Sequence, residues 1–126
     1  MKKKILIVDE DTSLLKAYRA MFEPKGISVV GATTGQEGLT LVSSEKPDVI
    51  LLDIMLPGGM NGFDVLEQLK RNPVTADIPV IALTNLDSEE KVAKSIGATD
   101  YVVKANTTKD EIIKLVMDCL QPSKSV

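Results

Sequence analysis

The segment Val49–Asp53, with the sequence VILLD, places four apolar residues in succession and then a carboxylate. Continuous apolar runs without polar alternation are typical of strands that are buried on both faces, as in parallel sheets. The run Ile5–Val8 (ILIV) has the same form and is followed by three acidic residues, Asp9, Glu10 and Asp11. These two segments predict a parallel sheet whose strands end in carboxylates.

Further apolar runs alternate with segments of helical period along the rest of the chain. The additional predicted strands are Val29–Val30, Val80–Leu83 and Tyr101–Val103. Helices are predicted over residues 14–22, 34–46, 63–70, 88–96 and 108–120. Thr34 and Thr108 each precede a glutamate by three residues, the spacing of a capping box, and Ser88 is a further predicted N-cap. The order predicts a (βα)₅ fold, a three-layer α/β sandwich around a five-stranded parallel sheet.

Composition narrows the class of protein. A chain of 126 residues is expected to form one domain, which we place at residues 1–121, with a disordered C-terminal tail at 122–126. The net charge of −3 argues against nucleic-acid binding, and no apolar run is long enough to span a membrane. With no secretory signal, the expected location is cytoplasmic. The chain has no histidine, which excludes histidine catalysis, histidine metal ligands and a phosphohistidine of its own.

Polar side chains gather where the predicted strands end. Asp9–Asp11 follow the first strand, Asp53 ends the third, and Thr84 and Lys104 follow the fourth and fifth. In open parallel sheets, ligands bind at this carboxyl edge. Close carboxylates without histidine or cysteine favour a hard cation such as Mg²⁺ or Mn²⁺. A carboxylate can also attack phosphorus, and a metal, an ammonium and a hydroxyl would stabilise the transferred phosphoryl group.

Four motifs together resemble those of response-regulator receiver domains. They are ILIVDED at Ile5–Asp11, LLDIMLP at Leu51–Pro57, ALT at Ala82–Thr84 and YVVK at Tyr101–Lys104, and they occur in the family's order over nearly the whole chain. The resemblance implies a flavodoxin-like fold with strand order 2-1-3-4-5. It also implies a phosphorylation switch of a two-component phosphorelay. Such a chain is not an enzyme, apart from catalysing its own phosphoryl transfer and dephosphorylation.

The resemblance assigns roles residue by residue. Asp53 matches the phosphoacceptor. The implied Mg²⁺ ligands are Asp9, Glu10, Asp53 and the backbone carbonyl of Met55. Thr84 matches the hydroxyl that turns towards the phosphoryl group, and Lys104 matches the lysine that pairs with that group. Tyr101 matches the aromatic residue whose orientation changes with that of the threonine. Asp11 is instead expected to cap the first helix.

The implied partners are proteins. The phosphoryl group would arrive in trans from a sensor histidine kinase or a phosphotransfer protein, because the chain has no histidine. Output would pass to a downstream protein, or to a second copy, through the surface of the helix over 88–96, the strand over 101–103 and the helix over 108–120. The chain ends soon after that helix, so it is expected to act by docking or to be part of a longer regulator.

A candidate output face lies on the last helix. Ile112, Leu115, Val116 and Cys119 form one apolar stripe, and Ile113, Met117 and Leu120 form a second stripe beside it. One face of a sheet needs only the first stripe, so part of the second is expected to be exposed, unless a neighbouring helix covers it. The candidate face comprises Tyr101, Ile113, Met117 and Leu120.

Two departures from the family's usual motifs lie near the predicted site. The loop Gly58–Gly62 is one residue longer than usual, and Ala105 replaces the proline that commonly follows the lysine. A cis bond without proline costs about 2.5–4 kcal/mol, so the sequence leaves open whether the bond after Lys104 is trans or has the cis form that is usual in the family.

Alternative functions remain open from the residues alone. Asp9 followed by Asp11 resembles the nucleophile motif of haloacid-dehalogenase phosphatases, although Asp53 would then have no role. A phosphorylation-independent interaction module and a flavin or nucleotide module on the same fold are further alternatives.

Overall fold

The structure, a computed structural model, describes residues 2–85 and 88–121. The predicted disordered tail at 122–126 lies outside the described residues. The strands are β1 (Lys4–Val8), β2 (Ser28–Ala32), β3 (Val49–Asp53), β4 (Val80–Thr84) and β5 (Asp100–Val103). The helices are α1 (Thr12–Phe22), α2 (Gly35–Glu45), α3 (Gly62–Arg71), α4 (Glu90–Ile96) and α5 (Lys109–Leu120). Short 3₁₀ helices follow α1 at Glu23–Lys25 and β5 at Lys104–Asn106.

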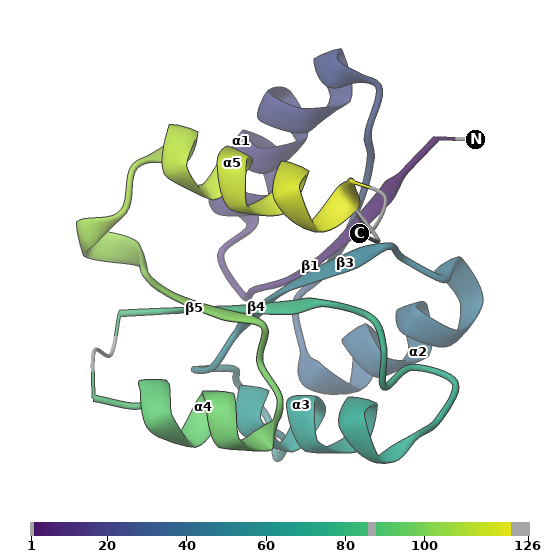
Figure 1. Ribbon diagram of the computed structural model, residues 1–126, viewed down its shortest axis with the longest axis vertical. Coiled ribbons are helices and arrows are strands. Elements are labelled where there is room, and N and C mark those ends of the chain that lie inside the picture. The colour runs from purple at the N-terminus through teal and green to yellow at the C-terminus, as the bar shows by residue number, and fades with distance from the viewer. Residues whose placement is uncertain (1, 86–87, 122–126) are drawn as a thin grey trace, which may run out of the picture.

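All strand pairs are parallel and the sheet order is β2-β1-β3-β4-β5, which confirms the expected topology. Figure 1 shows α1 and α5 on one face of the sheet and α2, α3 and α4 on the other. No helix among the described residues is long and apolar enough to cross a membrane. Because each helix returns the chain to the same end of the sheet, every loop after a strand lies at one edge. That edge is where Asp9, Asp53, Thr84 and Lys104 occur.

Two apolar clusters fill the space between the layers. Alternate strand residues point to opposite faces, so Ile5 and Ile7 pack beneath α1 and α5, while Leu6 and Val8 pack against the other helices. All five residues of β3 are buried, as its continuous apolar run predicts.

Most predicted helix starts are confirmed by side-chain hydrogen bonds. The Asp11 carboxylate accepts from the backbone N–H groups of Ser13 and Leu14, and Thr108 forms a reciprocal capping box with Glu111. The prediction at Ser88 was wrong. Helix α4 begins at Glu90 with Glu89 at its N-cap, and no side chain makes a capping hydrogen bond there.

The turn after β5 has a trans bond between Lys104 and Ala105, which answers the question that the sequence left open. The described backbone contains no cis peptide bond, and Lys104–Asn106 form a 3₁₀ turn. The Thr107 hydroxyl donates to the Val103 carbonyl at 2.9 Å and closes this turn. The turn therefore directs the Lys104 side chain from an edge strand towards the middle of the sheet.

Candidate functional site

The end of β1 presents one buried carboxylate to the sheet edge. Asp9 is 1% exposed, and its backbone N–H donates to the Ala32 carbonyl at 2.9 Å. Its Oδ1 accepts from the Asp11 N–H at 2.9 Å, which holds the side chain in place. The neighbouring Glu10 is exposed, and Asp11 is used as the helix cap. The three consecutive acids therefore have three different environments.

Asp53 ends the central strand β3 and is 6% exposed. Its Oδ1 accepts from the Met55 N–H at 2.9 Å, and its Oδ2 accepts from the Lys104 Nζ at 3.1 Å. Burial raises the pKa of the Asp53 carboxyl above its ordinary value, although the Met55 hydrogen bond and the Lys104 charge act in the opposite direction. The Met55 hydrogen bond thus fixes the orientation of the carboxylate, but this bond and the Lys104 charge do not fully offset the effect of burial on its pKa.

Lys104 connects the two buried carboxylates. Its Nζ lies 2.7 Å from the Asp9 Oδ2 as well as 3.1 Å from the Asp53 Oδ2. Burial alone would lower the pKa of the Lys104 ammonium, but the hydrogen bonds and negative charges of Asp9 and Asp53 outweigh it and raise that pKa. The lysine is therefore held in its charged form between the two acids.

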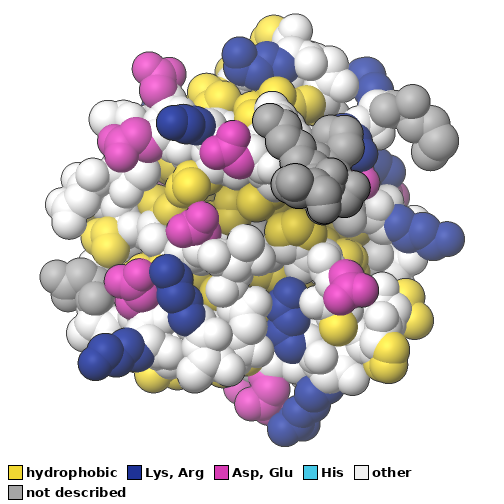
Figure 2. All heavy atoms as spheres, in the orientation of Figure 1, with side chains coloured by type: hydrophobic (Ala, Val, Ile, Leu, Met, Phe, Trp, Pro, Cys, Tyr) yellow, Lys and Arg dark blue, Asp and Glu magenta, His cyan; other side chains and the backbone are white. Residues whose placement is uncertain are grey.

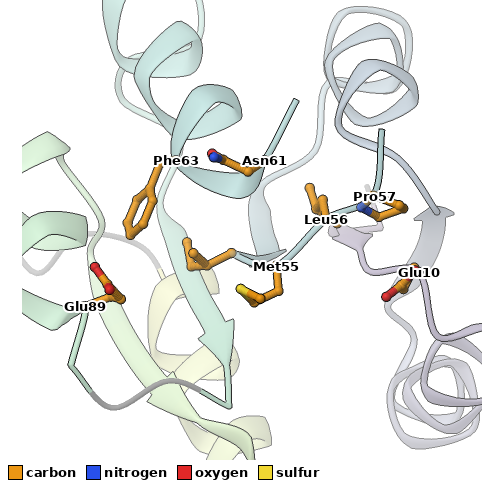
Figure 3. Close-up of a pocket in the computed structure, with 8 residues that line it drawn as sticks. Glu10, Met55, Leu56, Pro57, Asn61, Phe63 and Glu89 are labelled. Carbon is orange, nitrogen blue, oxygen red and sulfur yellow. The ribbon is translucent and has the colours of Figure 1, made fainter. Parts of the chain in front are cut away.

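These groups line a cavity of about 330 Å³ at the carboxyl edge of the sheet. Its lining residues are Asp9, Glu10, Asp11, Asp53, Met55, Asn85 and Lys104. A second cleft, of about 480 Å³, adjoins it and shares Glu10 and Met55. Figure 3 shows Glu10 and Glu89 on opposite sides of this cleft, with Met55 between them. Glu10 and Met55 therefore border both the cavity that contains Asp53 and the adjoining cleft.

The donor set fits a hard divalent cation. An ammonium already lies between Asp9 and Asp53, so this position favours positive charge. Among residues 2–85 and 88–121, no three acidic, cysteine or histidine side chains converge as a complete metal cage. Mg²⁺ does not need such a cage, because it usually keeps several waters and takes only one or two carboxylates from the protein. The carboxylates of Asp9 and Asp53, which line the same cavity, satisfy that requirement.

The two other predicted switch residues, Thr84 and Tyr101, do not line this cavity. Thr84 is the last residue of β4 and is fully buried. Tyr101 lies on β5 opposite Ala82 and is half-buried against the cluster beneath α2, α3 and α4. The structure therefore brings Asp9, Glu10, Asp53, Met55 and Lys104 together, with Thr84 and Tyr101 on the adjacent strands.

The predicted output residues do not form one surface. Leu120 is buried in the core, and Ile113 and Met117 are half-buried against the same cluster as Leu14 and Met21 of α1. The expected exposure of Leu120 was therefore wrong, whereas Ile113 and Met117 of the same stripe remain partly exposed.

The residues of α5 that lie near Tyr101 belong to the other side of the helix. A hollow of about 560 Å³ between β5 and α5 is lined by Tyr101, Val102, Thr107, Glu111, Lys114, Leu115 and Asp118. On the face seen in Figure 2, hydrophobic side chains gather in the band between α5 and β5, with charges of both signs around it.

Sequence reasoning missed two features of the site. Asn85 lines the cavity, and its position directly after Thr84 at a strand end was the signal that could have identified it. Phe63 and Glu89 line the adjoining cleft from α3 and from the start of α4. No local motif marks those two residues, because only the packing of the loops brings them beside Met55.

Comparisons with known proteins agree with this geometry. The family model described as "Response regulator receiver domain" matches residues 5–117. Protein PilH of Pseudomonas aeruginosa is 44% identical over 103 residues, which cover 80% of this chain and 84% of PilH. The Bacillus subtilis regulatory protein PhoP, named for alkaline phosphatase synthesis, is 39% identical over 106 residues, covering 82% of this chain but 43% of PhoP.

A solved structure is similar over nearly the full length. The two-component response regulator from Clostridium difficile superimposes with a TM-score of 0.87 at 28% identity, covering 98% of this chain and 100% of that one. The chain thus corresponds to most of PilH and to less than half of PhoP. With the receiver motifs at the ends of β1, β3, β4 and β5, and with the family match over 113 of its residues (5 to 117), the chain belongs to the response regulator receiver domain family of two-component signalling.

Proposed function

We propose that the chain is a phosphorylation switch in which Asp53 accepts a phosphoryl group from a phosphohistidine of another protein. The observation that carries this proposal is the environment of the Asp53 carboxylate. It is oriented by the Met55 N–H, it contacts the Lys104 ammonium, and it lines an open cavity at the end of the central strand. The sequence contains no histidine, so the phosphoryl donor acts in trans.

The chemical step is an in-line displacement at phosphorus. An Asp53 carboxylate oxygen forms the new P–O bond while the P–N bond to the donor imidazole breaks, and the imidazole nitrogen keeps the electron pair. Lys104 balances negative charge on the phosphoryl oxygens, and Thr84 donates its hydroxyl to one of them. Hydrolysis of the acyl phosphate reverses the switch, so the only reactions that the chain catalyses are on its own carboxylate.

The residues that would hold Mg²⁺ or Mn²⁺ are Asp9, Glu10, Asp53 and the backbone carbonyl of Met55. The metal would supply positive charge to the oxygens of the transferring phosphoryl group. The protein contributes the fixed carboxylates. Asp9 is oriented by the Asp11 N–H, and Asp53 by the Met55 N–H, so neither side chain needs to reorganise when the cation binds.

Output would pass to a protein partner or to a second copy of the chain through the surface of α4, β5 and α5. Phosphorylation favours the state in which Thr84 contacts the phosphoryl group. The side chain of Tyr101, on the neighbouring strand β5, changes its orientation together with that of Thr84. The hollow that joins Tyr101 to Leu115 supports this surface. Leu120 is excluded from this surface by burial, and Ile113 and Met117 are half-buried and do not line that hollow. Sensor kinases and phosphotransfer proteins act in the cytoplasm, which is the location that we propose.

The alternative functions receive less support. In a phosphatase of the haloacid-dehalogenase class, Asp9 would be the nucleophile, but Asp53, which shares the cavity and the Lys104 ammonium with Asp9, would then have no role. A module that works without phosphorylation would not require Lys104 and the two buried carboxylates to share one cavity.

The test is intact-mass analysis after incubation with Mg²⁺ and acetyl phosphate. We expect wild type to gain one phosphoryl group and Asp53→Ala to gain none. A mass gain in Asp53→Ala that disappears in Asp9→Ala would favour the phosphatase. No gain in any of the proteins would refute the switch.

A further inference from the structure

The start of helix α3 lies very close to the backbone of Asp53, the proposed phosphoacceptor, and of Ile54. The Gly62 N–H, at the start of α3, donates to the Ile54 carbonyl at 2.9 Å. A methyl group on Gly62 would overlap the Asp53 carbonyl oxygen and would lie 2.5 Å from the Ile54 Cα. Real Cβ contacts essentially never fall below 3.0 Å, and both of these neighbours are backbone atoms that cannot rotate away. Only glycine fits at this position without moving the end of β3.

The reason for glycine at position 62 is space and not backbone conformation. The glycines with positive φ in the described chain are Gly26, Gly58 and Gly97. Gly62 is the first residue of a helix, where alanine is ordinarily preferred over glycine. By contrast, a methyl group on Gly59 would meet nothing within 4 Å. Gly35, Gly38 and Gly97 also have neighbours within 3.0 Å, but those are side-chain atoms, whereas the close neighbours of Gly62 are the backbone of the segment that carries Asp53.

The segment that Gly62 contacts is the one that orients the site. The Ile54 N–H donates to the Leu83 carbonyl of β4 at 3.1 Å, and the Met55 N–H donates to the Asp53 Oδ1 at 2.9 Å. The bonds from Gly62 and to Leu83 thus tie Ile54 to α3 and to β4, and the third bond, within the segment, orients the Asp53 carboxylate. A displacement of Ile54 would carry with it both the Asp53 carboxylate and the Met55 carbonyl.

The same contact closes the base of the loop between β3 and α3. Residues 55–61 leave the sheet after Ile54 and return at Gly62, with Gly58 and Gly59 exposed at the far end. The extra loop residue noted in the sequence thus lies beyond the point where the two ends meet. Changes in the length of this loop need not reach the carboxylate.

We propose that Gly62 is a positioning residue for phosphoryl transfer, whose backbone contact with Asp53 and Ile54 sets the geometry of the acceptor and isolates it from the length of the following loop. The inference rests on the proposed function of Asp53. Misplacement of a reacting group by about 1 Å can cost on the order of a hundredfold in rate, so a methyl group at position 62 has a measurable consequence.

The experiment compares three variants with wild type: Gly62→Ala, Gly59→Ala, and an insertion of one glycine between Gly58 and Gly59. Phosphorylation is followed by intact mass across concentrations of acetyl phosphate and of Mg²⁺, and folding by thermal unfolding. Gly62→Ala is expected to lower the maximal rate at least about tenfold and to raise the Mg²⁺ concentration required, because Asp53 and the Met55 carbonyl move together. Gly59→Ala and the insertion are expected to stay within about twofold of wild type, because neither contacts the site.

Either of two results overturns the proposal. One is a folded Gly62→Ala protein with wild-type kinetics, and the other is a glycine insertion that slows phosphorylation as much as Gly62→Ala does. If Gly62→Ala does not fold, the insertion variant still tests whether the length of the loop affects phosphorylation of Asp53. Hydrogen exchange of the wild-type protein then tests the hydrogen bond between Gly62 and Ile54. The Gly62 amide is expected to exchange as slowly as amides within β3, and fast exchange would contradict the contact.

Failure of the proposed function has a different signature. Wild type would then take up no phosphoryl group under any condition. The Gly62 contact would still be judged by its amide exchange.

Discussion

The Lys104 ammonium lies 2.7 Å from the Asp9 carboxylate, which joins β5 to β1 across the two strands between them. The same ammonium reaches Asp53 on the central strand at 3.1 Å. Lysine therefore supplies the positive charge that two buried carboxylates need in the absence of metal. Any cation that binds these acids must share them with Lys104.

Replacing Lys104 by methionine should destabilise the metal-free protein by about 1–3 kcal/mol, because Asp9 and Asp53 would be buried without a counter-charge. Mg²⁺ should restore more stability to this variant than to wild type, since the competing ammonium is gone. A ligand at a hundred times its Kd contributes about 2.7 kcal/mol. Urea unfolding with and without Mg²⁺ measures both effects.

Lys94→Met is the matched control for that substitution. Lys94 forms an exposed ion pair with Glu90 at 3.2 Å, and exposed pairs contribute about 0–1 kcal/mol. Equal losses in Lys94→Met and Lys104→Met would show that the bridge between Asp9 and Asp53 does not stabilise the fold.

Asp53→Asn should raise the stability of the metal-free protein at neutral pH. The pKa of Asp53 is raised above its ordinary value of 3.8, so the folded protein binds this proton more tightly than the unfolded chain. Charged Asp53 therefore costs stability at neutral pH, and the cost disappears as pH falls through the raised pKa towards 3.8. Thermal unfolding between pH 7 and pH 4 in the presence of a chelator should show the advantage of asparagine shrinking on acidification.

The exposed carboxylate of Asp118 provides the comparison for this pH series. Asp118→Asn removes one exposed carboxylate outside the cavity of Asp53, so a stability gain that appears only in Asp53→Asn comes from the buried site. If the stability advantage of Asp53→Asn grew on acidification, the pKa of Asp53 would be lowered by folding and not raised, which would contradict this prediction.

Asp9 and Asp11 are two residues apart and should respond to alanine in different ways. Asp11→Ala removes the cap of α1 and should cost about 0.5–2 kcal/mol of stability while phosphorylation of Asp53 continues. Asp9→Ala removes a carboxylate of the proposed metal site and should reduce Mg²⁺-dependent phosphorylation strongly. Measuring unfolding and mass gain on both variants separates capping from metal binding. Loss of phosphorylation in both would mean that Asp11 also serves the site.

Leu120→Ala should destabilise the protein by about 2–5 kcal/mol, the usual cost of truncating a buried leucine. Val74→Ala is the control, because Val74 is 86% exposed and surface truncations stay within about 0.5 kcal/mol. Denaturant unfolding of the two variants tests whether Leu120 belongs to the core. A loss for Leu120→Ala no larger than that for Val74→Ala would return this residue to the candidate output face.

The family motifs predicted the strand order, and local spacing predicted the capping box at Thr108 and the N-cap at Thr34. At Thr34 the box is incomplete, because the Glu37 carboxylate accepts from the Thr33 N–H and not from the N–H of the N-cap. The apolar runs specify buried strands, and the fold then brings Asp9, Asp53 and Lys104 to one edge. The family motifs also selected Thr84 and Tyr101 as candidate switch residues. Both lie on strands, β4 and β5, that the apolar runs had already predicted.

What the sequence could not predict depends on packing between elements. Leu120 lies on the same helical stripe as Ile113 and Met117, yet only the position of α1 beside α5 decides that it is covered. The distance from Lys104 to Asp9 depends on the 3₁₀ turn after β5, and the contact of Gly62 with Ile54 depends on how the loop returns. Neither has a signature in residue periodicity.

The central claim is that the phosphoryl group is carried by Asp53, and the most direct measurement locates it chemically. Wild-type protein is incubated with Mg²⁺ and acetyl phosphate, treated with borohydride to reduce the acyl phosphate to homoserine, and digested for peptide mass mapping. The account predicts homoserine at position 53 alone, and only in the sample that contained Mg²⁺. Homoserine at position 9, or no homoserine anywhere in a folded protein, would contradict it.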